Sequence, residues 1–162
     1  MINCGEGTKS FHMKILVTND DGIFANGLWT LVRELSNVAQ VIVIAPDREQ
    51  SALGTAVTLN QPLRAQKVQP AVPDVEAYSV EGTPSDSVVL ALCKLTKGRI
   101  DLIVSGINHG ANLGNDTFIL GTVGAALQGY WCGLPALTVS INAIDRQYLG
   151  NAAKLAALLV KK

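Results

Sequence analysis

The chain has 162 residues, of which 48% are hydrophobic, 5% aromatic and 16% charged, and its 13 basic residues balance 13 acidic ones. A chain of this length buries about 70% of the surface that its unfolded form exposes, which predicts one well-cored globular domain rather than a disordered chain. The balanced charge argues against a nucleic-acid polymer or a membrane surface as the main partner, and no apolar run approaches the roughly 20 residues of a membrane-spanning helix.

Residues 1–12 contain neither hydrophobic periodicity nor the long apolar core of a signal peptide, so we expect an N-terminal tail outside the fold and a cytoplasmic protein. Residues 13–162 contain no linker or internal repeat and predict a single domain. Because the sequence stops directly after its last predicted helix, this domain is a candidate for truncation at its C-terminus.

The first part of this domain begins with a β–α–β pattern. A short apolar run over residues 14–18 predicts a strand buried on both faces, apolar residues at helical spacing over 28–35 predict a helix, and residues 41–45 predict a second strand that Pro46 ends. Residues 47–80 are less regular. Alternation at 56–59, 63–68 and 78–80 predicts short, partly antiparallel strands there.

The second part returns to alternating helices and strands. Thr83 predicts a helix N-cap with Pro84 at the first helical position. Further strands are predicted at residues 101–105 and 136–140, helices at 121–131 and 148–160, and a glycine-rich loop at 106–114. The alternation predicts a Rossmann-like, doubly wound α/β fold, which is a mostly parallel sheet with helices on both faces, here with a short irregular β insertion.

Polar side chains follow the predicted parallel strands, at the sheet edge where ligands bind in open α/β folds. They are Asn19, Asp20 and Asp21 after the first strand, Ser51 after the second, and Asn108 and Asn112 in the glycine-rich loop. Such oxygen ligands suit Mg²⁺, Mn²⁺ or Ca²⁺ better than Zn²⁺. Two adjacent carboxylates also repel each other, and a cation between them removes that cost.

Each of these signals also has a simpler structural explanation. Asp20-Asp21 before a glycine fits a turn and a helix N-cap, Ser51 fits an ordinary loop serine, and the glycine-rich loop fits a flexible connection. The same glycines equally allow backbone amides to approach an anion. The glycine spacings of dinucleotide and nucleoside-triphosphate sites are missing, and a Ser-His-Asp triad would depend on His109 without a Gly-x-Ser-x-Gly elbow.

Five motifs occur in order along the chain: MKILVTNDDGI at residues 13–23, APDREQS at 45–51, EGTPSD at 81–86, VSGINHGANLG at 104–114 and GTV at 121–123. Together they resemble the SurE family of survival proteins, metal-dependent 5′/3′-nucleotidases that hydrolyse nucleoside monophosphates and, in some members, polyphosphate. The resemblance extends over about residues 13–141.

The resemblance implies one divalent cation, Mg²⁺ or Mn²⁺, bound by Asp20, Asp21, Ser51 and Asn108. Either Asp20 or Asp21 would serve as the general base, and the sequence does not choose between them. The implied phosphate- or substrate-binding positions are Asn19, Asn108, Asn112, Gly121 and Thr122. His109 falls at a variable position of the family motif and receives no catalytic role. The implied partners are small nucleoside monophosphates and further copies of the chain in a homodimer or homotetramer.

Two features depart from the family pattern. Leu120 stands directly before Gly121, where the family usually has a serine that can donate a hydrogen bond to phosphate. Family members also continue well beyond the length of this chain, with a hairpin and a C-terminal segment that help to build the oligomer. The alternative function is therefore a catalytically degenerate homologue that binds metal or nucleotide, or only assembles.

Overall fold

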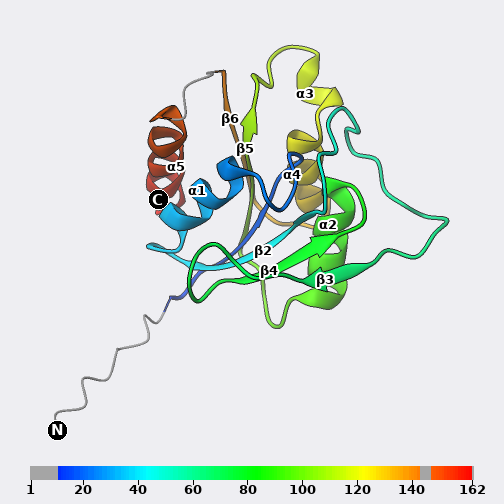
Figure 1. Ribbon diagram of the computed structural model, residues 1–162, viewed down its shortest axis with the longest axis horizontal. Helices are drawn as coiled ribbons and strands as arrows, with labels where there is room; N and C mark the ends of the chain where they lie inside the picture. Colours follow the sequence, from blue (N-terminus) through cyan, green and yellow to red (C-terminus); the bar gives the residue numbers. More distant parts are fainter. Residues whose placement is uncertain (1–10, 143–146, 162) are drawn as a thin grey trace, which may run out of the picture.

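The structure is a computed structural model that describes residues 11–142 and 147–161, and it contains a six-stranded sheet flanked by helices (Figure 1). In chain order the elements are β1 (Lys14–Thr18), α1 (Asn26–Leu35), β2 (Gln40–Pro46), β3 (Ala65–Lys67), β4 (Glu76–Val80), α2 (Pro84–Leu90), the π-helical turn η1 (Ala91–Leu95), β5 (Leu102–His109), α3 (Asp116–Ile119), α4 (Gly121–Trp131), β6 (Ala136–Ile141) and α5 (Gln147–Val160).

The strands lie in the order β3-β4-β2-β1-β5-β6, and every pairing is parallel except that of β3 with β4. Along the chain the sheet first grows from β1 through β2 to β4 and then restarts on the other side of β1 with β5 and β6. The strand order therefore reverses between β1 and β5. This is the topological switch point, where open α/β sheets bind their ligands. The predicted doubly wound α/β fold is confirmed.

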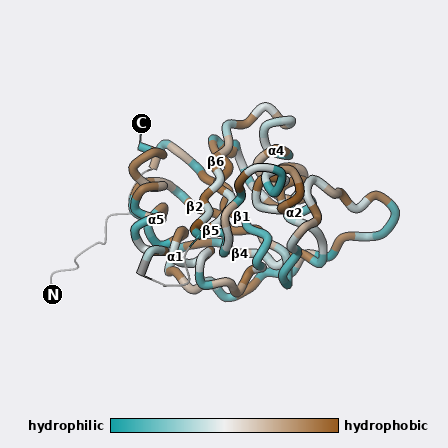
Figure 2. Tube along the Cα trace, turned by 90° about the horizontal axis from the view of Figure 1, so that it is seen from above, coloured by the Kyte–Doolittle hydropathy of each residue, from teal (hydrophilic) through white to brown (hydrophobic). Residues whose placement is uncertain are grey.

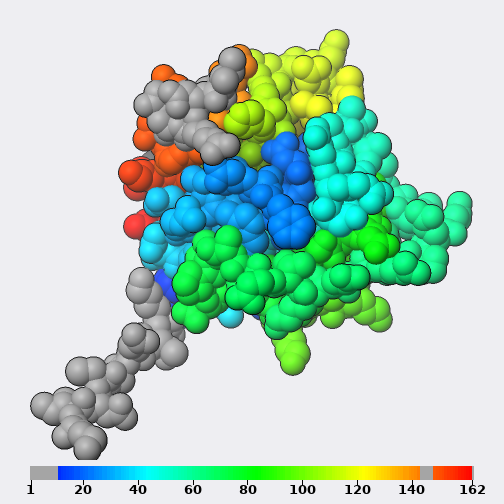
Figure 3. Space-filling view, in the orientation of Figure 1, coloured from blue at the N-terminus to red at the C-terminus, as the bar shows by residue number. Residues whose placement is uncertain are grey.

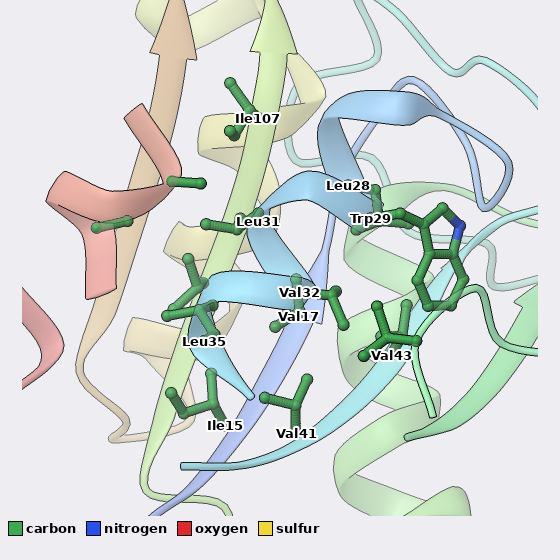
Figure 4. Packing of buried hydrophobic residues seen from close by; sticks show 14 of the residues in the cluster. Ile15, Val17, Leu28, Trp29, Leu31, Val32, Leu35, Val41, Val43 and Ile107 are labelled. Atoms are coloured by element: carbon green, nitrogen blue, oxygen red, sulfur yellow. The ribbon is translucent and has the colours of Figure 1, made fainter. Parts of the chain in front are cut away.

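Two hydrophobic cores lie on opposite faces of the sheet (Figure 2). The larger core contains buried residues of α1 and α5, and the smaller contains buried residues of α2, η1 and α4. Leu28, Leu31 and Leu35 recur on one face of α1 and are fully buried against the strands (Figure 4). Truncating one of them to alanine would cost about 2–5 kcal/mol, because the cavity left behind closes only partly.

The predicted N-cap of α2 is present as a full capping box. The Thr83 hydroxyl accepts the Asp86 amide at 3.0 Å, and the Asp86 carboxylate accepts the Thr83 amide at 2.9 Å. Asp86 also accepts both the amide of Thr58, at 2.8 Å, and its hydroxyl, at 2.7 Å. A single buried carboxylate thus starts α2 and anchors the segment that follows β2.

The structure differs from the predicted elements in two places. Residues 56–59 form no strand, because hydrogen bonds from Thr58 to the side chain of Asp86 hold this segment instead of a ladder. Of the strand predicted at 63–68, only residues 65–67 form β3. The strand predicted to end at residue 105 continues to His109, past a bulge between Gly106 and Asn108. Gly106 permits this continuation, since a Cβ there would lie 2.3 Å from the Val139 carbonyl oxygen of β6.

Of the predicted N-terminal tail, Phe11 and His12 are described and belong to no helix or strand, and residues 1–10 lie outside the described residues. Across residues 11–142 and 147–161, no helix combines the length and the apolar character needed to cross a membrane.

Candidate functional site

Three chain segments meet where β1 ends at the switch point. The segment after β1, coloured blue in Figure 3, touches the cyan segment that follows β2 and the yellow-green segment around the end of β5. Thr18, the last residue of β1, is paired with Ser105 of β5, so the residues that follow both strands leave the sheet at the same edge. The structure therefore brings the residues predicted from three separate motifs to one place.

Asp20 is held inside this site by the N-terminus of α4. It is 1% exposed, and its Oδ1 accepts the Thr122 hydroxyl at 2.6 Å. Gly121 makes this contact possible, since a Cβ there would lie 2.9 Å from the Cβ of Asp20. Asp20 Oδ2 is buried and has no hydrogen-bond partner in the described part of the chain. One carboxylate oxygen is thus fixed, while the other is buried without a ligand.

The two neighbouring carboxyl groups both bind protons more tightly than usual. Burial raises the pKa of Asp20, although the hydrogen bonds from Thr122 and Gly121 oppose that rise. Burial and the charge of Asp20 raise the pKa of Asp21 to about 6, and the backbone amide of His109 opposes this shift. Removing water from a carboxylate disfavours its charged form, and a like charge adds to that cost. A positive charge between these two side chains would therefore stabilise their ionised forms.

The segment after β2 supplies the next predicted ligand. The Gln50 amide donates to the Asp20 carbonyl oxygen at 2.7 Å, which ties this segment to the end of β1. Ser51 follows directly, and its exposed hydroxyl donates to Glu49 Oε1 at 2.7 Å. The charge of Glu49 also contributes to the raised pKa of Asp21, so Glu49 belongs to the electrostatic surroundings of the site.

The end of β5 supplies the amide side chains. Asn108 is 6% exposed, and its Nδ2 donates to the Gly110 carbonyl at 3.0 Å and to Asn112 Oδ1 at 3.3 Å. Asn112 in turn donates to the Ser140 hydroxyl at 2.7 Å. Both bonds of Asn108 use its nitrogen, which leaves the carbonyl oxygen, the atom that a hard cation binds, available.

Asn19 is fully buried, and its Nδ2 donates to the Gly22 carbonyl at 3.1 Å. It closes the turn that presents Asp20 and Asp21. Its predicted contact with substrate stays a prediction, as do the predicted phosphate contacts of Asn112, Gly121 and Thr122.

The residues of the site fit a divalent cation of the Mg²⁺ or Mn²⁺ type. The described residues contain no group of three or more His, Cys, Asp or Glu side chains placed to hold a metal, which leaves a mixed set of carboxylate, amide and hydroxyl oxygens. The buried, unpartnered Oδ2 of Asp20 is the strongest sign of such a site, because an unpaired buried carboxylate oxygen is costly. Hard oxygen donors are the ligands that these cations prefer.

A cavity of about 430 Å³ opens beside Asp21. It lies between the first turn of α1, the end of β5 and the beginning of α5. The described residues that line it are Asp21, Ala25, Asn26, Gly27, Ile107, His109 and Leu149.

Sequence reasoning missed three contributions to this site. Glu49 lies within the APDREQS motif but carries no spacing signal of its own. His109 lowers the pKa of Asp21 through its backbone amide and through its charge, and neither effect can be read from the sequence. The Thr122 hydroxyl donates a hydrogen bond to Asp20, a residue 102 positions earlier in the chain. Only the fold brings these partners together.

Comparison with known proteins agrees with this architecture. The family model described as Survival protein SurE matches residues 15–162. The chain belongs to the SurE family. A protein of Dehalococcoides mccartyi named 5′-nucleotidase SurE is 55% identical over 152 residues, which are 93% of this chain and 57% of that protein. A protein of Aliivibrio fischeri with the same name is 44% identical over 155 residues, 95% of this chain and 58% of its own length.

A solved structure of a SurE protein, from Aquifex aeolicus, superimposes with a TM-score of 0.80 at 35% sequence identity and covers 91% of this chain and 58% of its own. The chain thus spans a little less than three fifths of the length of these SurE relatives.

Proposed function

We propose that the protein hydrolyses the phosphate monoesters of nucleoside 5′- and 3′-monophosphates with the help of one divalent cation. The observation that carries the proposal is the pair Asp20 and Asp21 at the switch point. Asp20 Oδ2 is buried without a hydrogen-bond partner in the described structure, and the pKa of both carboxyl groups is raised. The name 5′-nucleotidase SurE, given to relatives that are 55% and 44% identical, supports the same reaction class.

In this proposal Asp20, Asp21, Ser51 and Asn108 hold Mg²⁺ or Mn²⁺. When bound, such a cation neutralises part of the phosphate charge and makes water a stronger nucleophile. Thr122 keeps Asp20 in place, since its hydroxyl already donates to that carboxylate.

We assign the role of general base to Asp21. Asp21 lines the open cavity at the end of β5, where water can reach its carboxylate, whereas Asp20 is 1% exposed. Asp20 is less suited, because the Thr122 hydroxyl already donates to its Oδ1.

Release of inorganic phosphate from nucleoside monophosphates tests the proposal. We expect activity that a chelator abolishes and that Mn²⁺ or Mg²⁺ restores. Turnover that persists in excess chelator would overturn the metal-dependent mechanism.

A second candidate, a homologue that binds metal without turnover, is favoured by one observation. Leu120 offers no hydroxyl in front of α4, and the Thr122 hydroxyl in the first turn of α4 is engaged with Asp20 rather than free for phosphate. Mn²⁺ binding without phosphate release would select this candidate.

We further propose that the protein forms a homodimer or homotetramer in the cytoplasm. Large apolar side chains at the site edge of the sheet support self-association, since Phe24, Leu113 and Phe118 are 79%, 73% and 77% exposed. Light scattering after size-exclusion chromatography tests the assembly, and cell fractionation tests the location. A monodisperse monomer at micromolar concentration would refute the assembly.

A further inference from the structure

We propose that the hydroxyl groups of Thr18, Ser85 and Ser105 enclose an internal water molecule beneath Asp20, and that this water positions Asp20 for the cation. The water site follows from burial and contacts within the described residues and does not depend on the proposed function. Its effect on the cation rests on the proposed function, because it takes Asp20 to be a metal ligand.

Two of these hydroxyl groups belong to neighbouring strands. Thr18, the last residue of β1, is paired with Ser105 of β5. Leu16 and Ile103, two residues earlier on each strand, belong to the smaller core, which α2 and α4 cover. Because side chains alternate along a strand, Thr18 and Ser105 lie on this same face of the sheet. The smaller core therefore ends in a pair of hydroxyl groups at the edge that carries the site.

The third hydroxyl group comes from the helices that cover this face. The helices α2 and α4 pack side by side (Figure 2), and α2 also contacts β1. A Cβ at Gly121, the first residue of α4, would lie 2.9 Å from Asp20 Cβ and 2.9 Å from Pro84 Cγ. The first turns of both helices therefore meet at Asp20. Ser85 follows Pro84 in the first turn of α2, which brings its hydroxyl to the layer below Asp20.

The three hydroxyl groups are buried and unsatisfied. Thr18, Ser85 and Ser105 are each 0% exposed, and none of their hydroxyl oxygens has a hydrogen-bond partner within the described residues. A buried polar group without a partner is costly, and an internal water that binds two to four such groups removes that cost.

The chemistry of this layer suits water better than substrate or an ion. Side chains that solvent does not reach are closed to a phosphate ester, which enters from solvent. A hydroxyl group has no charge with which to hold an ion, and it both donates and accepts hydrogen bonds, as water does. An enclosed water molecule is therefore the ligand that three neutral hydroxyl groups fit.

Such a water would join the elements that surround Asp20. Asp20 follows Thr18 by two residues, and the Thr122 hydroxyl holds its Oδ1 from the side of α4. A water bound to all three hydroxyl groups links β1 to β5 and to α2, so the backbone that carries Asp20 keeps its place when the carboxylate binds a cation. Groups behind a metal ligand commonly orient it in this way. Thr18, Ser85 and Ser105 are positioning residues, since they contact neither substrate nor cation.

Removal of single hydroxyl groups tests the inference. Thr18→Val replaces the hydroxyl with a methyl group of similar size, and Ser85→Ala and Ser105→Ala delete the hydroxyl. Ser87→Ala is the matched control. Ser87 is also fully buried in α2, but its hydroxyl donates to the Thr83 carbonyl oxygen at 3.1 Å.

The sign of the change in Tm separates a water site from dry hydroxyl groups. If water bridges the three groups, each variant takes one partner from that water, and the Tm should fall by roughly 2–5 °C. If the groups were dry, removing one would relieve its desolvation cost and the Tm would rise. Thr18→Val decides between these outcomes, because it nearly preserves the packed volume.

Two further measurements compare the unmodified protein, the double variant Thr18→Val/Ser105→Ala and Ser87→Ala. Oxygen-17 magnetic relaxation dispersion of the metal-free protein counts long-lived internal waters, and exchange of hydroxyl hydrogens does not affect it. Electron paramagnetic resonance gives the affinity for Mn²⁺. We expect the double variant to lose a long-lived water and to bind Mn²⁺ roughly tenfold more weakly, and Ser87→Ala to change neither quantity.

Each part of the inference has its own refutation. A higher Tm for Thr18→Val, or a water count that the double variant leaves unchanged, would overturn the water site. A double variant that has lost the water but keeps its Mn²⁺ affinity would overturn the positioning of Asp20. If the unmodified protein bound no Mn²⁺, the proposed metal-dependent function would fail, and the Tm and the water count would still decide whether the water site exists.

Discussion

The hydroxyl of Thr122 gives the sharpest test of how the site is held together. It is fully buried in the first turn of α4 and donates to Asp20 Oδ1 at 2.6 Å. Thr122→Val replaces it with a methyl group of similar size, so the packing is kept and the donor is lost. A hydrogen bond to a charged group contributes about 1.5–3 kcal/mol, so we expect the affinity for Mn²⁺ to fall roughly 10- to 150-fold.

Electron paramagnetic resonance of free Mn²⁺ measures this affinity without any turnover. The pH dependence of binding gives a second readout, because loss of the donor raises the pKa of Asp20 further and should move Mn²⁺ binding to higher pH. Thr122→Ser keeps the hydroxyl and should bind Mn²⁺ nearly as the unmodified protein does. A folded Thr122→Val protein with unchanged Mn²⁺ affinity would show that this hydroxyl does not prepare Asp20 for the cation.

Three further substitutions probe neighbouring contacts. The pKa of Asp21 rises from its ordinary 3.8 to about 6 on folding, so the metal-free protein loses stability as the pH rises through that window. Asp21→Asn should therefore raise the Tm of the metal-free protein at pH 7, by roughly 2–4 °C for each kcal/mol of stability recovered. The variant should show no gain in Tm below pH 4, and it should release no phosphate. A lower Tm at pH 7 would contradict the assigned cause. Leu120 is the N-cap of α4, and its side chain makes no capping hydrogen bond. Leu120→Ser should therefore raise the free energy of unfolding, measured with denaturant, by about 1 kcal/mol and should also raise kcat/KM. Unchanged values would place this side chain outside the site. Gly121→Ala should lower both the Tm and the Mn²⁺ affinity, because the new Cβ would lie 2.9 Å from Asp20 Cβ and from Pro84 Cγ. Gly150→Ala in α5 has open space around it and should change neither. Equal behaviour of the two variants would refute the steric argument.

The parts of the fold that were predicted correctly are those whose signal is local. Apolar runs such as Lys14–Thr18 report a strand buried on both faces, and Thr83 followed by Pro84 reports a helix start. The segment around Thr58 was predicted as a strand and is not one. Its hydrogen bonds go to the side chain of Asp86, 28 residues later, and no local pattern contains that partner.

The same contrast between local signals and distant partners applies to the site. The residue types after β1, β2 and β5, together with their motifs, were sufficient to select Asp20, Asp21 and Asn108 as candidates. The partners that define their chemistry come from elsewhere in the chain, as the contacts of Thr122 with Asp20 and of His109 with Asp21 show. Predicting them required the three-dimensional arrangement at the switch point.

The double anchoring of the segment after β2 also has a consequence for how this family can change. Gln50 ties its beginning to Asp20, and Thr58 ties its middle to Asp86, so the stretch that contains Ser51 is fixed at both ends. Residues 59–62, beyond the second anchor, are exposed and extend away from the sheet (Figure 1). Insertions, tags or a fluorescent label placed there would leave Ser51 where it is. Substitutions in this outer part of the segment should therefore have little effect on the site.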